Sequence, residues 1–162
     1  MITNINGDLL IADVDIIAHQ TNCKGVMGSG VPKQIADKYP SILPDYVSTC
    51  TRHKDKCLGN ILYVSPKENR NILIANLFWQ NEYGGGNKVY TNFEALKKCF
   101  ISLANIKYDS YFLIDKTIVK IAIPYKIGCH RGGEDWNKVY DMIYKIFGEV
   151  NDIDLQIWKY NK

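Results

Sequence analysis

The chain has 162 residues, of which 46% are hydrophobic and 23% are charged, and its 20 basic and 17 acidic residues give a formal net charge of +3. This composition describes one ordinary globular domain, residues 1–162, and leaves no room for a second full domain. Folding at this length buries about 68–70% of the chain's surface, so the core needs no metal or disulfide staple. The balanced charge predicts no basic stripe of the kind that nucleic-acid-binding domains carry.

The cysteines also limit the classes to which the protein can belong. Cys23, Cys50, Cys57, Cys99 and Cys129 are odd in number, widely spread and form no C-x-x-C pair. This spacing argues against a zinc ribbon, a thioredoxin-like motif and a closed disulfide framework. The sequence shows neither a secretory leader nor an apolar run approaching the roughly 18 residues of a membrane span. We therefore expect a cytoplasmic protein that does not bind membranes.

Strands and helices are predicted to alternate along the chain, which indicates an α/β fold. Strands are assigned to short β-branched runs and helices to apolar spacings of three and four. In chain order, these elements are strands Ile2–Asn6 and Ile16–Thr21, helices Val31–Lys38 and Leu43–Cys50, strands Asn60–Ser65 and Asn71–Leu77, a helix beginning at Thr91, strand Ile118–Pro124, helix Trp136–Phe147 and strand Asp154–Tyr160. Several of the strands are apolar on both faces, as expected when helices cover both sides of a sheet.

The helix after Thr91 carries the clearest local signals. Thr91-Asn-Phe-Glu94 has the form of a capping box, with Thr91 as the N-cap. Phe93, Leu96, Phe100 and Leu103 then fall on one apolar stripe.

The segment from His19 to Val31 is the most informative for function. A buried strand ends in a polar cluster and is followed by a glycine loop, Gly25-Val-Met-Gly-Ser-Gly30, that leads into a helix. Glycines allow close backbone approach, and the free N–H groups at the helix start offer donors and partial positive charge to an anion. The segment matches neither the G-x-G-x-x-G dinucleotide pattern nor the P-loop. A phosphate site and a simple tight turn remain the two interpretations.

A second glycine-dense loop, from Pro124 to Trp136, also follows a buried strand and opens into a helix. In α/β sheets the ligand crevice lies beyond the carboxyl ends of the strands, and both loops leave strands at those ends. We therefore predict a diphosphate held between the two loops.

These residues resemble the macrodomains, a family that binds ADP-ribose and its derivatives, over nearly the whole chain. The resemblance rests on Gly7-Asp-Leu-Leu10, His19-Gln-Thr-Asn22, the loop Gly25–Gly30, Asn76-Leu-Phe78 and Pro124–Trp136. The run Asn22–Val31, followed by Gln34-Ile-Ala and Tyr39-Pro40, is most similar to the small ADP-ribose 1''-phosphate phosphatases. The resemblance implies a three-layer α/β/α sandwich with a mixed, mostly parallel central sheet.

The same resemblance assigns roles at the adenine end of the ligand. It implies that Asp8, beside Leu9, accepts a hydrogen bond from the adenine amino group, whereas capping of a short turn is the alternative for Asp8. Trp158 or Tyr160 on the last strand would stack on adenine, or else would belong to the packing of the protein.

The remaining ligand contacts are implied to be mainly contacts to the backbone. Asn22 would hydrogen-bond the distal ribose. The diphosphate would be wrapped on one side by Met27, Gly28, Ser29, Gly30 and Val31, and on the other by Gly128, Cys129, His130, Arg131, Gly132 and Gly133. Gln20, Thr21 and Ile127 are further substrate-binding residues of this prediction. The loop Asn81–Asn87 is either a flap over the cleft or a flexible surface loop.

His19 and Asp135 are the candidates for catalysis. His19 ends a buried strand beside the proposed distal ribose, and a side chain with a reference pKa near 6.5 suits acid or base work at neutral pH. Asp135 is a candidate for activating water, with Glu134 as a weaker one. The alternatives are a core histidine and first-turn acids favoured by a helix dipole. His130 and Arg131 depart from the small or apolar residues usual in this loop of the family and are candidates to bind a terminal phosphate.

Three functions are compatible with these patterns. The first is an enzyme that converts ADP-ribose 1''-phosphate to ADP-ribose and phosphate, without a metal or cofactor. The second is a hydrolase acting on ADP-ribosylated macromolecules or on O-acetyl-ADP-ribose. The third is a module that binds ADP-ribose without turnover. We expect a monomer, and the abundance of Ile, Asn, Lys and Tyr fits a bacterial or phage genome.

Overall fold

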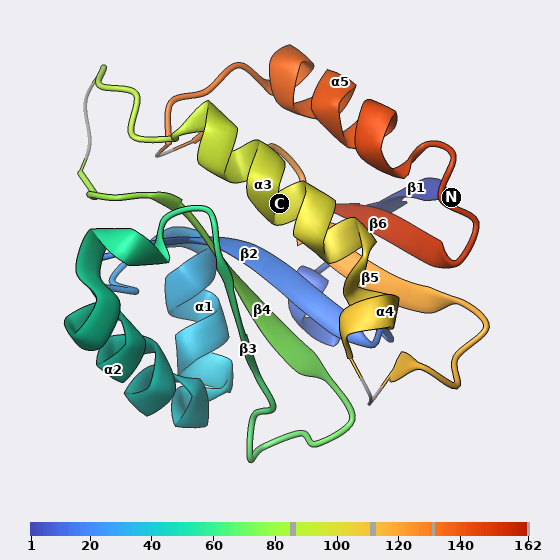
Figure 1. The fold of residues 1–162 in the computed structure, drawn as a ribbon, viewed down its shortest axis with the longest axis horizontal. Coiled ribbons are helices and arrows are strands. Elements are labelled where there is room, and N and C mark those ends of the chain that lie inside the picture. The colour runs from blue at the N-terminus through green and yellow to red at the C-terminus, as the bar shows by residue number, and fades with distance from the viewer. Residues whose placement is uncertain (85–86, 111–112, 131, 162) are drawn as a thin grey trace.

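A computed structural model describes residues 1–84, 87–110, 113–130 and 132–161. A six-stranded sheet with strand order β1-β6-β5-β2-β4-β3 forms its centre (Figure 1). Its strands are β1 (Ile2–Asn6), β2 (Ile16–Asn22), β3 (Ile61–Val64), β4 (Leu73–Gln80), β5 (Val119–Pro124) and β6 (Ile153–Lys159). Neighbouring strands are parallel except at one edge, where β3 pairs antiparallel with β4. The predicted mixed, mostly parallel sheet is confirmed.

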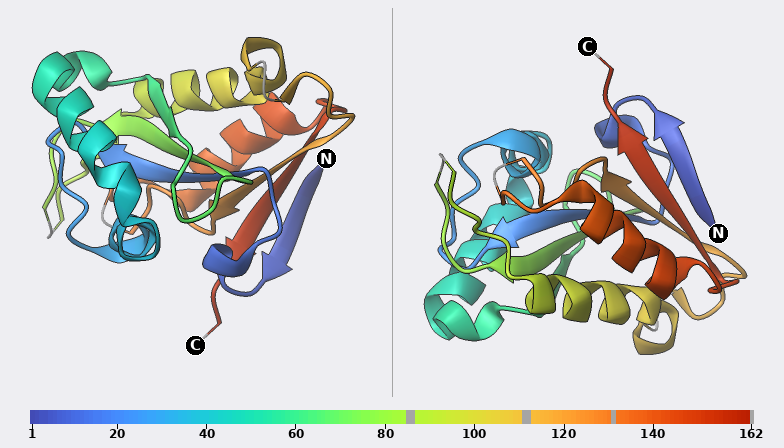
Figure 2. Two further views of the ribbon diagram at one scale, coloured as in Figure 1. Left: turned by 90° about the horizontal axis from the view of Figure 1, so that it is seen from below. Right: turned by 90° about the horizontal axis from the view of Figure 1, so that it is seen from above.

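Helices cover both faces of the sheet, which makes the predicted three-layer arrangement (Figure 2). The helices are α1 (Gly30–Lys38), α2 (Leu43–His53), α3 (Phe93–Ala104), the short α4 (Ile106–Asp109) and α5 (Trp136–Phe147), and the 3-10 turns are η1 (Leu9–Ile11), η2 (Pro40–Ile42) and η3 (Lys54–Cys57). In Figure 2, α3 and α5 lie together over one face, and α1 crosses the other.

The pattern of apolar residues along β2 explains the two layers. Successive side chains of a strand point to opposite faces. Ile16 and Ala18 accordingly pack in the cluster that α3 and α5 complete, and Ile17 packs in the cluster of α1 and α2. β2 is buried along both faces because it lies between β5 and β4 in the sheet.

Most predicted element boundaries shift by one to three residues, and two of these corrections bear on the site. Asn92, not Thr91, is the N-cap of α3, and its side chain accepts a hydrogen bond from the Ala95 N–H. Thr91 instead donates its hydroxyl to the carbonyl of Gly128 at 2.9 Å, so the predicted capping box does not form. β4 continues beyond the predicted Leu77 to Gln80, because Phe78 pairs with Thr21 and Gln80 with Asn22 of β2, with a register shift at Trp79.

Within the described residues, no helix has the length and apolar character needed to cross a membrane. The five cysteines are all free thiols. The same described part of the chain contains no group of three or more His, Cys, Asp or Glu side chains arranged to hold a metal ion.

Substitution of Phe100 tests how much the packing of α3 and α5 on the sheet contributes to stability. This fully buried ring contacts Trp79 and Phe147 edge to face, with centroid distances of 5.4 and 6.0 Å. Phe100→Ala should lower the free energy of unfolding by about 3–5 kcal/mol, since it leaves a cavity between helix and sheet. The adjacent Ile101 is 44% exposed, and Ile101→Ala should cost only about 0.5 kcal/mol. Urea unfolding of both variants measures the difference, and equal losses would contradict this packing.

Candidate functional site

A cleft of about 900 Å³ lies where the parallel strands β2, β4 and β5 end. Its walls come from the ends of these strands, from the loops that follow them and from the start of α1. The lining residues are Gln20, Thr21, Asn22, Val26, Gly28, Ser29, Gly30, Val31, Pro32, Gln34, Gln80, Tyr83, Gly84, Pro124, Tyr125, Lys126, Ile127, Gly128 and His130. The cleft therefore lies between the two glycine loops, at the predicted edge of the sheet.

The first loop is shaped by the side chain of Asn22. Its Oδ1 accepts hydrogen bonds from the backbone N–H groups of Lys24 at 2.9 Å and Val26 at 3.4 Å, and its Nδ2 donates to the carbonyl of Val26 at 2.8 Å. The buried hydroxyl of Tyr46 donates to the backbone carbonyl of Asn22 at 2.8 Å. Gly25 has φ +76°, a conformation that favours glycine. Asn22 thus fixes the path by which the chain turns from β2 into the loop.

The N-terminus of α1 is open toward this cleft. Its N-cap residue, Ser29, makes no side-chain capping hydrogen bond. The helices α3 and α5 are capped, in contrast, by Asn92 and Asp135. The first N–H groups of a helix have no partner within the helix and carry partial positive charge. α1 therefore presents unused donors where the ligand of this cleft would lie.

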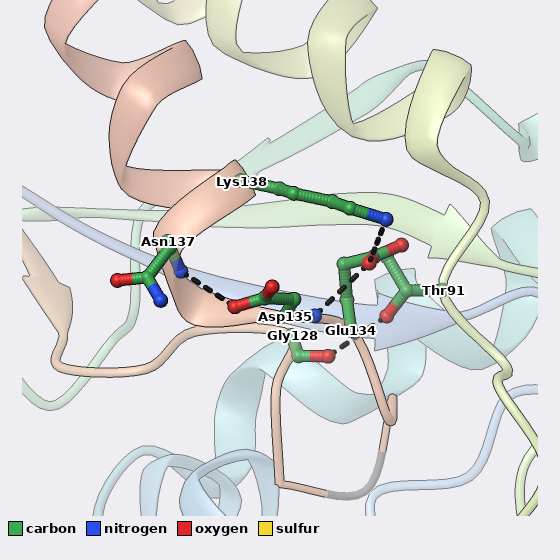
Figure 3. Close-up of polar contacts among 6 residues, drawn as sticks. All are labelled: Thr91, Gly128, Glu134, Asp135, Asn137 and Lys138. Atoms are coloured by element: carbon green, nitrogen blue, oxygen red, sulfur yellow. Dashed lines mark hydrogen bonds and ion pairs between the residues drawn. The ribbon is translucent and has the colours of Figure 1, made fainter.

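The second loop, which follows β5, is hydrogen-bonded to the segment that precedes α3 (Figure 3). The Thr91 hydroxyl donates to the Gly128 carbonyl at 2.9 Å, and the Glu134 N–H donates to the same carbonyl at 3.3 Å. The backbone N–H groups of Tyr90 and Thr91 donate to the carbonyl of Gly132 at 2.8 and 3.1 Å. These bonds anchor both ends of the loop, so its turn is held against the cleft.

The electrostatics of the cleft favour a negatively charged ligand. Among the described lining residues there is no Asp or Glu, while Lys126 and His130 lie on the second loop. Backbone N–H groups and the start of α1 add partial positive charge. A diphosphate fits these groups, because its oxygens accept hydrogen bonds and it carries no donor.

Ten of the residues predicted to bind the ligand lie together in the cleft. They are Gln20, Thr21, Asn22, Gly28, Ser29, Gly30, Val31, Ile127, Gly128 and His130. Met27 and Gly132 are buried within the two loops, and Gly133 is exposed. Cys129 faces a smaller hollow on the other side of the second loop, and burial raises the pKa of its thiol to about 11. Arg131 lies outside the described residues.

His19 is placed away from the cleft, against its predicted catalytic role. The side chain is fully buried in β2 and its Nε2 lies 2.7 Å from Oδ1 of Asn76 on β4. Burial lowers the pKa of His19 to about 4, so the imidazole is neutral at pH 7. A ligand in the cleft does not reach this ring, because it contributes nothing to the lining. The geometry is that of the core histidine given as the alternative.

Asp135 also performs the alternative task. Its side chain accepts a hydrogen bond from the Asn137 N–H at 2.9 Å and caps α5, as Figure 3 shows. Asp135 and Glu134 line the smaller hollow of about 490 Å³ and not the cleft between the glycine loops. Neither carboxylate is therefore positioned to activate water at a ligand held between those loops.

The residues assigned to adenine lie outside the lining of the cleft. Asp8 caps η1, where its Oδ1 accepts a hydrogen bond from the Leu10 N–H at 2.9 Å, and Leu9 is buried. Trp158 is partly buried on β6 beside Gly7 and donates its indole N–H to Gln156 at 3.0 Å. Tyr160 follows the end of β6 and is 66% exposed. Their adenine contacts stay predictions.

Several lining residues were missed by reasoning from the sequence. They are Val26, Pro32, Gln34, Gln80, Tyr83, Gly84, Pro124, Tyr125 and Lys126. Gln80 ends β4, and Tyr83 and Gly84 come from the segment considered as a flap. Gln80 lies at the carboxyl end of β4, next to β2. The rule that ligands bind beyond the carboxyl ends of parallel strands could have identified it, but the rule was applied only to the loops after β2 and β5.

No family model matches the chain. The chain is 28% identical over 165 residues to the DNA ADP-ribosyl glycohydrolase of Mycobacterium tuberculosis, which covers 98% of this chain and 42% of that protein. It is 34% identical over 86 residues to an ADP-ribose 1''-phosphate phosphatase of Saccharomyces cerevisiae, which covers 52% of this chain and 48% of that protein. The chain thus spans less than half the length of both relatives.

Solved structures give the same class of fold. The macrodomain of Mycobacterium tuberculosis DarG superposes with a TM-score of 0.81 at 25% identity, covering 98% of this chain and 97% of that one. The Thermosipho africanus DarTG structure in complex with ADP-ribose superposes with a TM-score of 0.76 at 14% identity, covering 97% of this chain and 41% of that one. The chain therefore has the macrodomain fold.

The neutral His19 predicts a specific loss of stability in acid. Its pKa is lowered from 6.5 to about 4 in the folded state, so the unfolded chain takes up the proton first. Stability should therefore fall as the pH drops from about 6.5 to about 4, by up to about 3 kcal/mol from this residue. Urea unfolding at several pH values should show a shallower decline for His19→Gln than for the wild type. His53→Gln, at an exposed position, should keep the wild-type slope, and equal slopes in all three proteins would contradict the assignment.

Gly132 and Gly28 differ in the room around them. A Cβ on Gly132 would collide with Thr91 Oγ1 and the Gly128 carbonyl, whereas the nearest atom to a Cβ on Gly28 is Val26 Cγ1 at 3.6 Å. Gly132→Ala should therefore lower the unfolding free energy by about 1–3 kcal/mol, and Gly28→Ala by about 0.5 kcal/mol or less. Thermal unfolding of both variants measures the two losses of stability. A larger loss for Gly28→Ala than for Gly132→Ala would contradict the prediction.

Proposed function

We propose that this chain binds ADP-ribose in the cleft and hydrolyses the phosphate ester of ADP-ribose 1''-phosphate. The observation that carries the proposal is a cleft between two glycine loops whose described lining has no carboxylate, next to a helix N-terminus that no side chain caps. The ADP-ribose present in the DarTG structure and the name of the yeast relative support the same ligand class.

The diphosphate would be held mainly by the backbone. The N–H groups at the start of α1, from Ser29 to Val31, would approach it from one side. From the opposite loop the N–H groups of Gly128 and His130 would approach, since those of Ile127 and Cys129 already donate to the carbonyls of Pro124 and Lys126. Asn22 is occupied in shaping the first loop, so its contribution is to hold the donors of that loop in place. The distal ribose would then lie toward Gln20, Gln80 and Tyr83, which line the cleft between β2 and the segment after β4.

The reaction is attack of water on the terminal phosphorus. A water O–P bond forms, the bond between phosphorus and the 1''-oxygen breaks, and the leaving sugar oxygen takes up a proton, which gives ADP-ribose and inorganic phosphate. Lys126, His130 and the loop N–H groups would stabilise the charge on the transferred phosphoryl group. Buried thiols are not alternative nucleophiles, since burial raises the pKa of Cys23 to about 12 and keeps this thiol protonated.

A second candidate function is removal of ADP-ribose from modified DNA. It is favoured by the match to the DNA ADP-ribosyl glycohydrolase, which extends over 98% of this chain. Hydrolysis of a glycosidic bond commonly relies on a pair of carboxylates, and the described lining of the cleft contains none. The lining of the cleft therefore favours the phosphatase activity over the glycohydrolase activity.

Calorimetric titration and product analysis test the proposal together. ADP-ribose should bind at least about tenfold more tightly than AMP, because AMP lacks the diphosphate that both loops contact. Incubation with ADP-ribose 1''-phosphate should release inorganic phosphate. Release of ADP-ribose from a modified DNA oligonucleotide, without phosphate release from the ester, would favour the second candidate. Tight binding without any product would identify a binding module.

A further inference from the structure

Two glutamine side chains meet at the end of the cleft formed by β2 and β4. Gln20 Nε2 donates a hydrogen bond to Gln80 Oε1. Gln80 Nε2 in turn donates to the backbone carbonyl of Glu82 at 2.8 Å. Both side chains line the cleft, and Gln80 is 7% exposed. The direction of this chain of hydrogen bonds is fixed at its far end, because a backbone carbonyl only accepts.

The fixed direction leaves one acceptor for a ligand. The carbonyl of Gln80 already receives the Gln20 amide, and the Gln80 amide is used on Glu82. The side-chain carbonyl of Gln20 receives no hydrogen bond from any described residue, and it belongs to a side chain that lines the cleft. Gln80 thus holds the amide of Gln20 in one of its two orientations, with the carbonyl oxygen available.

The groups first expected to activate water lie elsewhere. His19 is buried behind the cleft, and Asp135 caps α5 beside the smaller hollow. The described lining supplies no carboxylate in their place. A phosphoryl transfer does not need a strong base, since a glutamine carbonyl is enough to orient an attacking water in some enzymes of this reaction class.

We propose that Gln20 is a catalytic residue whose side-chain carbonyl orients the attacking water, and that Gln80 is the positioning residue that fixes this carbonyl. The inference rests on the proposed phosphatase function. Water gives one hydrogen bond to Gln20 Oε1 and directs its lone pair at the phosphorus. The oxygen–phosphorus bond forms as the ester bond breaks, and the water's protons end on the products, inorganic phosphate and the sugar hydroxyl.

Substitution of the two glutamines tests the two roles separately. Gln20→Met keeps the length of the side chain and removes the carbonyl, so kcat for phosphate release should fall on the order of 100-fold. The Kd for ADP-ribose should rise by less than about tenfold, because Gln20 lies near the proposed distal ribose while the diphosphate contacts are elsewhere. Gln80→Met frees the Gln20 amide to rotate, and kcat should fall about tenfold. Gln80→Glu keeps an acceptor for Gln20 but loses the donor to the Glu82 carbonyl, so kcat should recover part of the loss seen in Gln80→Met, a partial rescue that a merely structural role would not give.

The controls distinguish a loss of catalysis by Gln20 from a loss of folding. Asn105→Ala removes an exposed amide at the end of α3 and should leave kcat unchanged. If Gln20→Met does not fold, Gln20→Asn serves instead, because it keeps the amide but withdraws the carbonyl by one carbon atom. Wild-type kcat in the folded Gln20 variant would overturn the inference and leave the proposed function intact. A wild-type protein that binds ADP-ribose but releases no phosphate from the ester would overturn both.

Discussion

The site depends on the parallel pairing of β2 with β5 and β4. Parallel strands bring their carboxyl ends to the same edge of the sheet, so the glycine loops after β2 and β5 face one another across the cleft. The start of α1 is left without a side-chain cap at this edge, while α3 and α5 are capped by their own residues. The first N–H groups of α1 have no side-chain partner and lie at the cleft, so they are available to an anionic ligand.

The polar groups around the cleft divide into those that shape it and those that remain available. Asn22, Tyr46 and Thr91 use their hydrogen bonds within the protein, where they fix the two loops. Nε2 of His19 and Oδ1 of Asn76 form a hydrogen bond inside the sheet. Gln20 differs from all of these, since its carbonyl has no partner among the described residues. A ligand in the cleft would find a hydrogen-bond acceptor at Gln20 and hydrogen-bond donors at the start of α1.

Much of the fold could be predicted from the sequence because short apolar strands and striped helices have strong local signals. β1 and α5 begin and end at the predicted residues. The cap of α3 was mistaken because Thr91 and Asn92 are both good caps, and only the contact with Gly128 decides between them. That contact joins residues 37 positions apart, and no local pattern reveals it.

The sequence predicts the location of the candidate site where it depends on the backbone, whereas the directions of its side chains depend on contacts between distant residues. Glycine loops at strand ends can be read from the sequence, and seven of their predicted binding residues line the cleft beside three from the end of β2. Whether His19 enters the cleft or the core depends on which face of β2 it occupies and on its partner Asn76, which lies on another strand. The same holds for Asp135, whose position before a helix suits both capping and catalysis.

A crystal structure of the protein with ADP-ribose is the most direct test of the central claim. The account predicts the diphosphate between Ser29–Val31 and Ile127–His130, with its oxygens within hydrogen-bond distance of backbone N–H groups at the start of α1. A diphosphate bound elsewhere on the protein, or a start of α1 that makes no contact with it, would contradict the account.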